Sequence, residues 1–559
     1  MADFGTFSLL LALCLSLYAI IASLTGVSLG KRRVTASGER AALASTAAAI
    51  LALGALLYLM LADDFATAHV ANNSSRTLPL LYKISAIWGG HDGSMLLWVF
   101  FTALLSGLAI VQNRRRCRDM MPWVVVVLMV NLAFFLALNL FLSNPFNQLV
   151  RITPDGATAP FVPADGQGLN PLLQYWAMVI HPPILYLGFI GFVVPFAFTI
   201  AALVTRQQGN DWVRIVRRWT LGTWLLLGIG IILGGKWAYV VLGWGGYWGW
   251  DPVENASLVP WLVGTALLHS IIVQERRGML KTWNVVLVTL TYLLGIFGTF
   301  LTRSGLVNSV HAFADSNLGR FFLYYMAFVL AGALLLVADR QSFLASKRRL
   351  DSMLSRESAF LFNNLVLVAA AFAVFWGTLF PALSEWLRGT KISVGPLFFD
   401  RINIPIGLLL LALTGIGPLL AWHKTSPAAL RRSFRWPGVV ALLALAALLA
   451  GGMRNFTVTV CLTLCAFVLA TIVQEFAAGA AVRMRHRGEP PPAALARLVG
   501  RNPRRYGGYI VHLGVVIMFV GFVGNAFNRE ATLRLETGET GRVGAYTLRL
   551  VDFLEGRKA

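Results

Sequence analysis

The chain has 559 residues, of which 57% are hydrophobic and 13% are charged. This composition excludes an ordinary water-soluble domain and indicates a polytopic membrane protein. The net charge of +22 does not indicate a nucleic-acid partner, because most basic residues fall in alternate loops, as the positive-inside rule of membrane topology requires. The same rule places the N-terminus and the loop at 236–257 outside the cytoplasm.

Fourteen uncharged apolar segments are each long enough, at roughly 18 residues or more, to cross a bilayer as a helix. We therefore predict an all-α membrane domain over residues 1–528, with about 14 transmembrane helices. The first segment follows Asp3 and has no basic region before it, which favours a retained helix over a cleaved signal peptide. The segments lie near residues 7–29, 41–62, 94–112, 121–142, 184–205, 219–235, 256–273, 282–302, 321–338, 359–383, 403–422, 436–453, 455–474 and 506–527.

The tail at 529–559 is polar and predicts a small extracytoplasmic β element. Hydrophobic and polar residues alternate with period two in Thr532–Leu535 and Tyr546–Val551, and glycines lie between the two runs. Because two strands alone are marginally stable in water, we expect this β domain to be incomplete in the chain.

The loop at 236–257 is the most informative part of the sequence. Five of the 17 tryptophans lie in the 25 residues from Trp237 to Trp261, which run from this loop into the next expected helix, with glycines between them: Trp237, Trp244, Trp248, Trp250 and Trp261. Clustered indoles supply stacking area and few hydrogen bonds, which suits a flat apolar ligand such as a porphyrin. The alternative is an aromatic belt at the membrane interface, but a belt spreads its aromatics over many helix ends.

Two pairs of histidines could bind the iron of such ligands. His269 and His512 lie inside apolar segments at matched depth, seven residues from the arginines at the cytoplasmic ends, which fits axial ligation of one haem b. The alternative is two unrelated histidines that pack between helices. His181 and His311 lie on the outer side with the Trp-rich loop, and the alternatives for them are a helix-start residue and an ordinary loop residue.

Two further outer-side features belong with this loop. The run Asp251-Pro252-Val253-Glu254 is typical of a helix start, with Asp at the N-cap, Pro at N1 and Glu at N3. We favour this structural role for both carboxylates over proton transfer. The role of His91, in W-G-G-H-D-G-S, is left open.

These motifs resemble one known family. The segment W-G-x-x-W-x-W-D-P-V-E-N at Trp244–Asn255 is similar to the WWD signature of the haem-handling protein superfamily. Within that superfamily the chain resembles the cytochrome c maturation protein F (CcmF) family and its NrfE-like relatives. The supporting segments are W-G-G-H-D-G-S at 88–94, H-P-P-I-L-Y-L-G-F at 181–189, R-S-G-L-V-N-S-V-H-A-F-A at 303–314 and Y-I-V-H-L-G at 509–514.

The resemblance implies a System I haem lyase of the bacterial inner membrane, with the Trp-rich loop in the periplasm. The expected partners are the haem chaperone CcmE, CcmH- and CcmI-type proteins that hold apocytochrome c, apocytochrome c itself and membrane lipid, with quinol as one candidate electron source. The implied haem platform is Trp237, Trp244, Trp248, Trp250 and Asp251. The implied ligands are His181 and His311 for the transferred haem, and His269 and His512 for a resident haem b.

The resemblance also carries two qualifications. No residue is expected to act as a general acid, a general base or a nucleophile. Members of the family usually have a larger extracytoplasmic domain and a further helix, whereas this chain ends at Ala559, which suggests truncation.

Three other functions are alternatives to the covalent attachment of haem to apocytochrome c. A membrane b-type cytochrome for electron transfer would use the buried histidine pair alone, and a haem transporter would use the platform without chemistry. An ion or proton transporter would need lysines or carboxylates within its spans, and the expected apolar segments contain none.

Overall fold

A computed structural model of the chain describes residues 1–152, 156–207, 209, 211–242, 246–307, 309, 318–346, 350–528 and 531–552. The chain forms two compact units. The first comprises Met1–Leu350 with Phe360–Asn403, and the second comprises Asp351–Ala359 with Ile404–Ala559. The division that the sequence suggests between 1–528 and 529–559 is a different one and stays a prediction.

Fourteen helical spans in the described residues are long and apolar enough to cross a membrane, so the predicted fold class is confirmed. The first ten are α1 (Ala2–Ser28), α2 (Arg32–Leu61), α5 (His91–Asn113), α6 (Met121–Phe141), α7 with α8 (Trp176–Ile190 and Val193–Val204), α9 (Asp211–Val241), α10 (Pro252–Arg277), α11 (Lys281–Arg303), α12 (Gly319–Asp339) and α14 (Arg356–Arg388). The last four are α15 (Pro396–Leu419), α16 (Pro427–Ala450), α17 (Phe456–Arg487) and α19 (Pro503–Gly524) with η3 (Asn525–Phe527).

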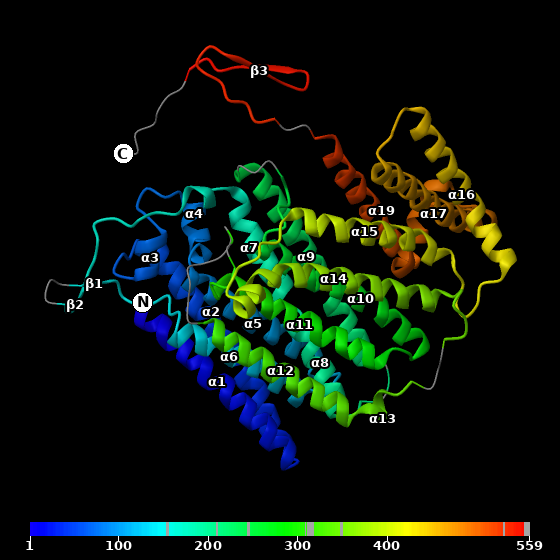
Figure 1. Ribbon diagram of the computed structural model, residues 1–559. Helices are drawn as coiled ribbons and strands as arrows, with labels where there is room; N and C mark the ends of the chain where they lie inside the picture. Colours follow the sequence, from blue (N-terminus) through cyan, green and yellow to red (C-terminus); the bar gives the residue numbers. More distant parts are fainter. Residues whose placement is uncertain are drawn as a thin grey trace. The chain divides into compact units, whose positions relative to one another are not determined.

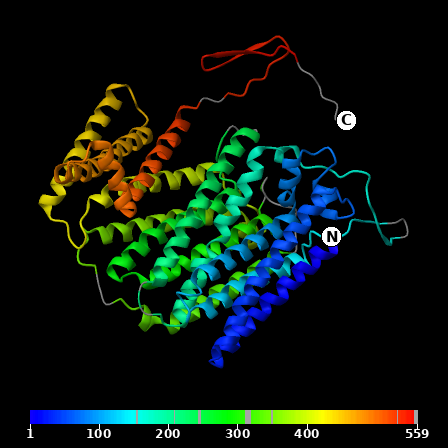
Figure 2. The same cartoon turned by 180° about the vertical axis from the view of Figure 1, so that it is seen from behind.

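Short elements connect these spans. They are α3 (Ala68–Asn73), α4 (Leu80–Ser85), η1 (Ala86–Trp88), η2 (Pro171–Leu173), α13 (Gln341–Leu344), α18 (Pro491–Arg501), the hairpin β1 (Val150–Ile152) with β2 (Thr158–Pro160), and the hairpin β3 (Thr540–Val543) with β4 (Tyr546–Arg549). At one edge of the first unit, α1 and α2 run side by side (Figure 1), and the view from behind shows the same pair (Figure 2). Small residues allow this contact, and the Ser16 and Ser45 hydroxyls meet at 2.8 Å.

The fifth span begins earlier than its apolar run suggests. Helix α7 starts at Trp176 and contains Pro182 and Pro183 in its interior, so His181 lies inside the helix and not at its start. Proline has no N–H for the helical ladder, and Pro182 leaves the Met178 carbonyl for another donor. That carbonyl accepts a hydrogen bond from Trp88 Nε1 at 2.9 Å. His91, which was expected in the loop before the third span, is the first residue of α5.

Charged residues lie in the end turns of several spans, because the helices extend beyond their apolar segments. Glu275 in the last turn of α10 pairs with Arg217 of α9, and Glu475 of α17 pairs with Arg505 of α19 at 2.5 Å. The sequence expectation of no carboxylate in the spans is therefore wrong for the full helices. Glu275 lies in the last turn of α10, whereas Glu475 lies twelve residues before the end of α17. Each carboxylate forms an ion pair with an arginine, which is a structural role.

Glycines bring α7 and α9 into close contact in the first unit. A Cβ on Gly188 would lie 2.5 Å from Leu227 Cα, and a Cβ on Gly230 would lie 2.9 Å from Leu185 Cα. Backbones can approach this closely only where no side chain intervenes, as is common between membrane helices. The contact sets the position of α7, whose N-terminal half carries His181.

The second unit has its own core. Side chains from α15, α17, α18 and α19 form it: Leu411, Cys461, Cys465, Val468, Ile472, Leu498, Tyr506, Tyr509 and Val516. In the C-terminal tail the expected strand Thr532–Leu535 is wrong, whereas β4 falls within the expected Tyr546–Val551. Strand β3 lies nearer to β4, since Val543 and Tyr546 pair across a two-residue turn, and two-residue connections are the preferred hairpin geometry.

We expect Gly188→Ala to destabilise the protein by about 2 kcal/mol, because the added methyl group overlaps backbone atoms of α9 that cannot move independently. Gly222→Ala on α9 is the matched control, since nothing lies within 4 Å of a Cβ at that position. Thermal unfolding of the detergent-purified chain, followed by circular dichroism, measures both. Equal midpoints for the two variants would contradict the proposed close contact.

Candidate functional site

His181 is held against α9 in two ways: the backbone of α7 packs closely on α9, and the His181 ring forms a hydrogen bond to the α9 backbone. His181 Nδ1 lies 2.8 Å from the Gly230 carbonyl oxygen, so Nδ1 carries the proton and donates. This tautomer leaves the lone pair on Nε2, the nitrogen that can bind a metal. A Cβ on Gly234 would lie 2.6 Å from the ring, and the Trp237 ring is centred 5.8 Å from it. The imidazole therefore lies beside the first tryptophan of the predicted platform.

The Trp-rich loop ends in a complete helix cap. Asp251 accepts a hydrogen bond from the Val253 N–H at 2.9 Å, and Glu254 accepts from the Asp251 N–H at 3.2 Å. These reciprocal bonds form a capping box with Pro252 at the first helical position, as the sequence predicts. Glu254 also accepts from the Gly249 N–H at 2.9 Å, so the cap holds the loop as well as the helix.

The cap connects to the chain segment after α11. Ser309 donates a hydrogen bond to Asp251 Oδ1 at 2.8 Å. His311, two residues further along, lies outside the described residues, and so does Trp244. Their predicted roles therefore stay predictions.

Trp250 and Trp248 are the predicted platform residues whose ring geometry the structure describes within the loop. Their rings meet edge to face, with centroids 6.0 Å apart. The Trp250 ring stacks on Phe399 of α15, with centroids 4.9 Å apart, so one face of this indole is covered by protein. Its Nε1 donates to Asp400 Oδ1 at 2.9 Å.

Hydrogen bonds within α10 and from α9 fix the orientation of His269 in α10. Its Nδ1 lies 2.8 Å from the Thr265 carbonyl oxygen and donates to it, which leaves Nε2 as the ligand nitrogen. The Thr265 hydroxyl accepts a hydrogen bond from Trp224 Nε1 at 2.8 Å. Trp224 in turn stacks on Trp261, with centroids 5.2 Å apart and planes 16° apart. The donor set and tautomer of His269 fit haem iron.

His512 lies in α19 of the second unit. Its ring meets the Tyr509 ring edge to face at 6.5 Å, and the side chain is half-buried. His269 is eight residues from the end of α10 at Arg277, and His512 is nine residues from Pro503 at the start of α19. At about 1.5 Å per residue, each histidine is roughly 12–14 Å along its own helix from that end, and their matched depth in the membrane stays a prediction.

Arg303 is a buried residue of this region that sequence reasoning did not single out. Only 1% of it is exposed, although it is the last residue of α11. Its guanidinium donates to the hydroxyls of Ser94 at 2.8 Å, Tyr186 at 3.4 Å and Thr299, which links α5, α7 and α11. A charge at the end of an apolar segment was the available signal, but Ser94 and Tyr186 come from distant parts of the sequence.

His91 joins a second polar cluster at the start of α5. Its Nδ1 lies 3.0 Å from Ser143 Oγ, and Ser143 donates to Asp92 Oδ1 at 2.7 Å. Asn139 donates to the Ser143 carbonyl at 2.7 Å. The cluster connects the start of α5 to the end of α6, which gives His91 a structural role.

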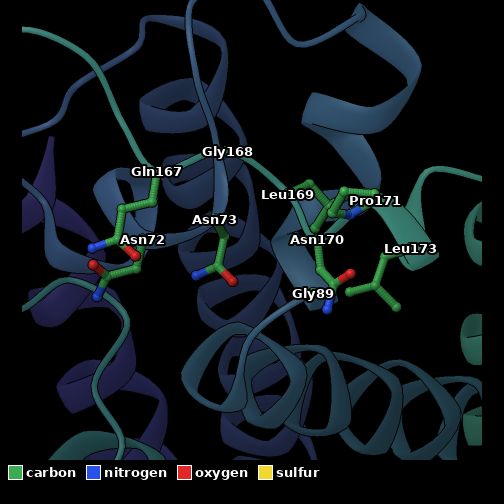
Figure 3. A pocket seen from close by; sticks show the side chains of 9 residues that line it. All are labelled: Asn72, Asn73, Gly89, Gln167, Gly168, Leu169, Asn170, Pro171 and Leu173. Atoms are coloured by element: carbon green, nitrogen blue, oxygen red, sulfur yellow. The ribbon is translucent and has the colours of Figure 1, made fainter. Parts of the chain in front are cut away.

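A polar cavity of about 450 Å³ lies beside the W-G-G-H segment. Figure 3 shows the residues that line it: Asn72, Asn73, Gly89, Gln167, Gly168, Leu169, Asn170, Pro171 and Leu173. Asn73 donates to the His69 carbonyl at 2.9 Å, and Asn170 accepts from the Leu172 N–H at 3.0 Å. Amide groups dominate the lining, so the cavity does not suit a porphyrin.

His69, beside this cavity, is a structural residue. Its ring is almost fully buried, with Nε2 3.1 Å from the Ile87 carbonyl oxygen. Burial lowers the pKa of His69 below its ordinary value, although the nearby Asp92 carboxylate acts in the opposite direction. The imidazole is therefore neutral near pH 7 and donates a hydrogen bond that fixes the turn before α5.

Comparisons with known proteins agree with the motif resemblance. The family model for cytochrome C assembly proteins matches residues 88–307. The chain is 40% identical over 550 residues to the cytochrome c-type biogenesis protein CcmF of Pseudomonas aeruginosa, an alignment that covers 97% of this chain and 80% of the relative. It is 36% identical over 566 residues to the protein of the same name from Escherichia coli, covering 99% and 82%. A solved structure of cytochrome c heme lyase CcmF matches with a TM-score of 0.78 and 31% identity, over 97% of this chain and 80% of that chain.

Because the pKa of His69 is lowered by burial, we predict that the free energy of unfolding decreases as the pH is lowered. An unfolded histidine takes up a proton near pH 6.5, whereas buried His69 resists protonation. The unfolded state therefore binds more protons below about pH 6.5, and the free energy of unfolding falls by up to about 1.4 kcal/mol per pH unit in that window. We expect the thermal midpoint to fall less between pH 7.5 and pH 5.5 in His69→Gln. His486→Gln, which removes an exposed imidazole, is the control, and identical slopes in the two variants would refute the assignment.

Proposed function

The chain belongs to the CcmF family of cytochrome c-type biogenesis proteins, and from this premise we propose that it is a haem lyase of cytochrome c maturation. In this proposal the Trp-rich loop receives haem outside the cytoplasm and holds it while apocytochrome c reacts. The observation that carries the proposal is the His181 site. A histidine with its proton on Nδ1 lies beside Trp237, in the chain whose loop has a fixed end at Asp251.

The proposed reaction is the addition of two cysteine thiols to two haem vinyl groups. Each sulfur of the CXXCH motif forms a bond to one vinyl carbon, the S–H proton goes to the other, and the vinyl double bond becomes single. No atom leaves, and no net oxidation occurs. The contribution of the chain is orientation, which removes much of the entropic barrier, since none of its residues is assigned as a nucleophile or a general base.

The substrate haem is proposed to lie between His181 and His311, with its plane against the indoles of Trp237, Trp244 and Trp248. Trp250 and Asp251 complete the proposed platform: Asp251 ends the loop through its cap, and Trp250 meets Trp248 edge to face. Flat aromatic surfaces give area for stacking and exclude water. Axial imidazoles hold the iron while leaving the vinyl edge open to the peptide.

A resident haem b is proposed on His269 and His512, and when bound it supplies an electron to the iron of the substrate haem. The residues fit this group, because His269 has its proton directed to the Thr265 carbonyl and both histidines lie within membrane helices, where an ionisable residue usually marks function. The Trp224 hydrogen bond to Thr265 orients the helix turn that carries His269.

The proposed setting is the bacterial inner membrane, with the loop on the periplasmic side. Haem would come from the chaperone CcmE, and apocytochrome c would be held by CcmH- and CcmI-type proteins, with quinol as one candidate electron donor. The second candidate function is a membrane b-type cytochrome. The His269 tautomer, with Nε2 as the ligand nitrogen, supports a b-type cytochrome equally well. A b-type cytochrome, however, gives the Trp-rich loop no role.

We expect His269→Ala to abolish the b-type absorption spectrum of detergent-purified protein, since a single remaining imidazole cannot hold the iron six-coordinate. His512→Ala should have the same effect. His486→Ala, outside the membrane core of the same unit, is the control and should keep the spectrum. Retention of a bis-histidine spectrum in both variants would remove these two residues from the proposal.

We expect His181→Gly to lose cytochrome c assembly and to regain part of it when imidazole is added. The vacated axial position accepts a small exogenous ligand, whereas the haem b spectrum persists because His269 and His512 are unchanged. His311→Gly is tested in the same way. If His181 only packs against α9, the variant gives less folded protein and imidazole has no effect, which counts against ligation.

A further inference from the structure

Trp250 has an unusual backbone for a bulky residue. Its φ is +55°, in the left-handed region that costs side chains other than glycine roughly 1 kcal/mol or more. Such a conformation persists where surrounding contacts determine it, and strained residues of this kind gather at functional sites. The contacts that hold Trp250 therefore determine how the Trp-rich loop is shaped.

Three separate contacts hold Trp250. Its indole Nε1 donates to Asp400 Oδ1 at 2.9 Å, and its ring stacks on Phe399 at 4.9 Å with planes only 11° apart. Its carbonyl oxygen accepts from the side-chain amide of Asn255 at 3.1 Å. Together they fix the ring plane, the ring rotation and the peptide orientation.

The supporting residues are themselves fixed by α14. Phe399 is only 2% exposed, and it packs where Gly377 has no side chain, since a Cβ there would lie 2.6 Å from the Phe399 ring. The next residue, Thr378, accepts the second hydrogen of the Asn255 amide at 3.0 Å. Two adjacent residues of α14 therefore fix both supports of Trp250: Gly377 makes room for the Phe399 ring, and Thr378 holds the Asn255 amide.

We propose that Asp400 is a positioning residue for the Trp-rich loop, acting through the indole N–H of Trp250. With Phe399 it holds Trp250 in the left-handed conformation. Trp250 in turn meets the Trp248 ring at 87°, with centroids 6.0 Å apart, so the anchored indole determines how the Trp248 ring is oriented. A hydrogen bond to a charged acceptor is stronger than a neutral one, which suits an aspartate at this position. The part of the inference that concerns haem rests on the proposed function, whereas loop positioning does not.

The first test measures loop order without haem. Chymotrypsin cleaves after Tyr247, Trp248 and Trp250 only when the loop opens locally, so the cleavage rate of the folded, detergent-purified chain reports the anchor. Asp400→Leu should raise this rate roughly tenfold, because losing a hydrogen bond to a charged group makes local opening of the loop more favourable by about that factor. Asp400→Asn keeps an acceptor oxygen and should restore most of the protection. Glu385→Gln, a carboxylate on α14 paired only loosely with Lys391 at 3.9 Å, should change nothing.

The second test shows whether Asp400 acts through Trp250. Trp250→Phe keeps a ring over Phe399 but removes the N–H donor, so it should raise cleavage about as much as Asp400→Leu. The double variant should be no worse than either single variant, because the two substitutions remove the same bond. Additive effects, or an unchanged cleavage rate in Asp400→Leu and in Trp250→Phe, would overturn the inference. Trp250→Phe leaves Asp400 in place, so the test survives a folding defect in Asp400→Leu.

The third measurement separates this inference from the proposed function. Transfer of haem from the loaded chaperone is followed in Asp400→Leu and Asp400→Asn, and the half-saturating chaperone concentration and the maximal rate are measured separately. Positioning predicts a lower maximal rate in Asp400→Leu and recovery in Asp400→Asn. If cleavage rises but haem transfer is unchanged, the anchor stands and the link to haem fails. If cleavage is unchanged, the anchor itself is wrong, whatever the chain does with haem.

Discussion

The hydrogen bonds at the start of α10 are the interactions on which the rest of the site depends. The first N–H groups of a helix have no partner within it, and here Asp251 and Glu254 supply acceptors in a reciprocal cap. The same two carboxylates also hold Gly249 and Ser309. One set of bonds therefore ends the loop, begins the helix that carries His269 and attaches the segment after α11. Removing it would disturb both proposed haem sites together.

The close packing of α7 against α9 supplies the other half of the geometry. A carbonyl oxygen has two lone pairs, and the Gly230 carbonyl, inside helix α9, accepts an additional hydrogen bond from the His181 ring. The glycine face of α9 lets that ring approach, and the same bond selects the tautomer. Helix packing and ligand chemistry are thus set by the same contact, so a change in one is expected to change the other.

Much of this architecture follows from the sequence, and the exceptions have physical causes. Apolar length predicts the fourteen spans, and the spacing Asp-Pro-x-Glu predicts the cap at Asp251. Apolar length does not predict the outer turns of α7, because the prolines after His181 suggest a start where the helix in fact continues. The Trp250–Asp400 bond joins residues 150 positions apart, and Arg303 finds two of its partners, Ser94 and Tyr186, on other helices. No local pattern encodes such contacts. The ligand roles of the four histidines remain predictions.

The most direct test of the account is thioether formation in a defined mixture. The detergent-purified chain is combined with haem-loaded chaperone, the apocytochrome-handling partners and a reduced apocytochrome with one CXXCH motif, and the product is measured by its pyridine haemochrome spectrum. The account predicts a c-type spectrum with the intact chain. It also predicts a much slower appearance with Trp248→Ala, while the thermal midpoint and the haem b spectrum are retained. Product formed at the same rate by Trp248→Ala, or no product with every partner present, would contradict the claim that the loop positions haem for attachment.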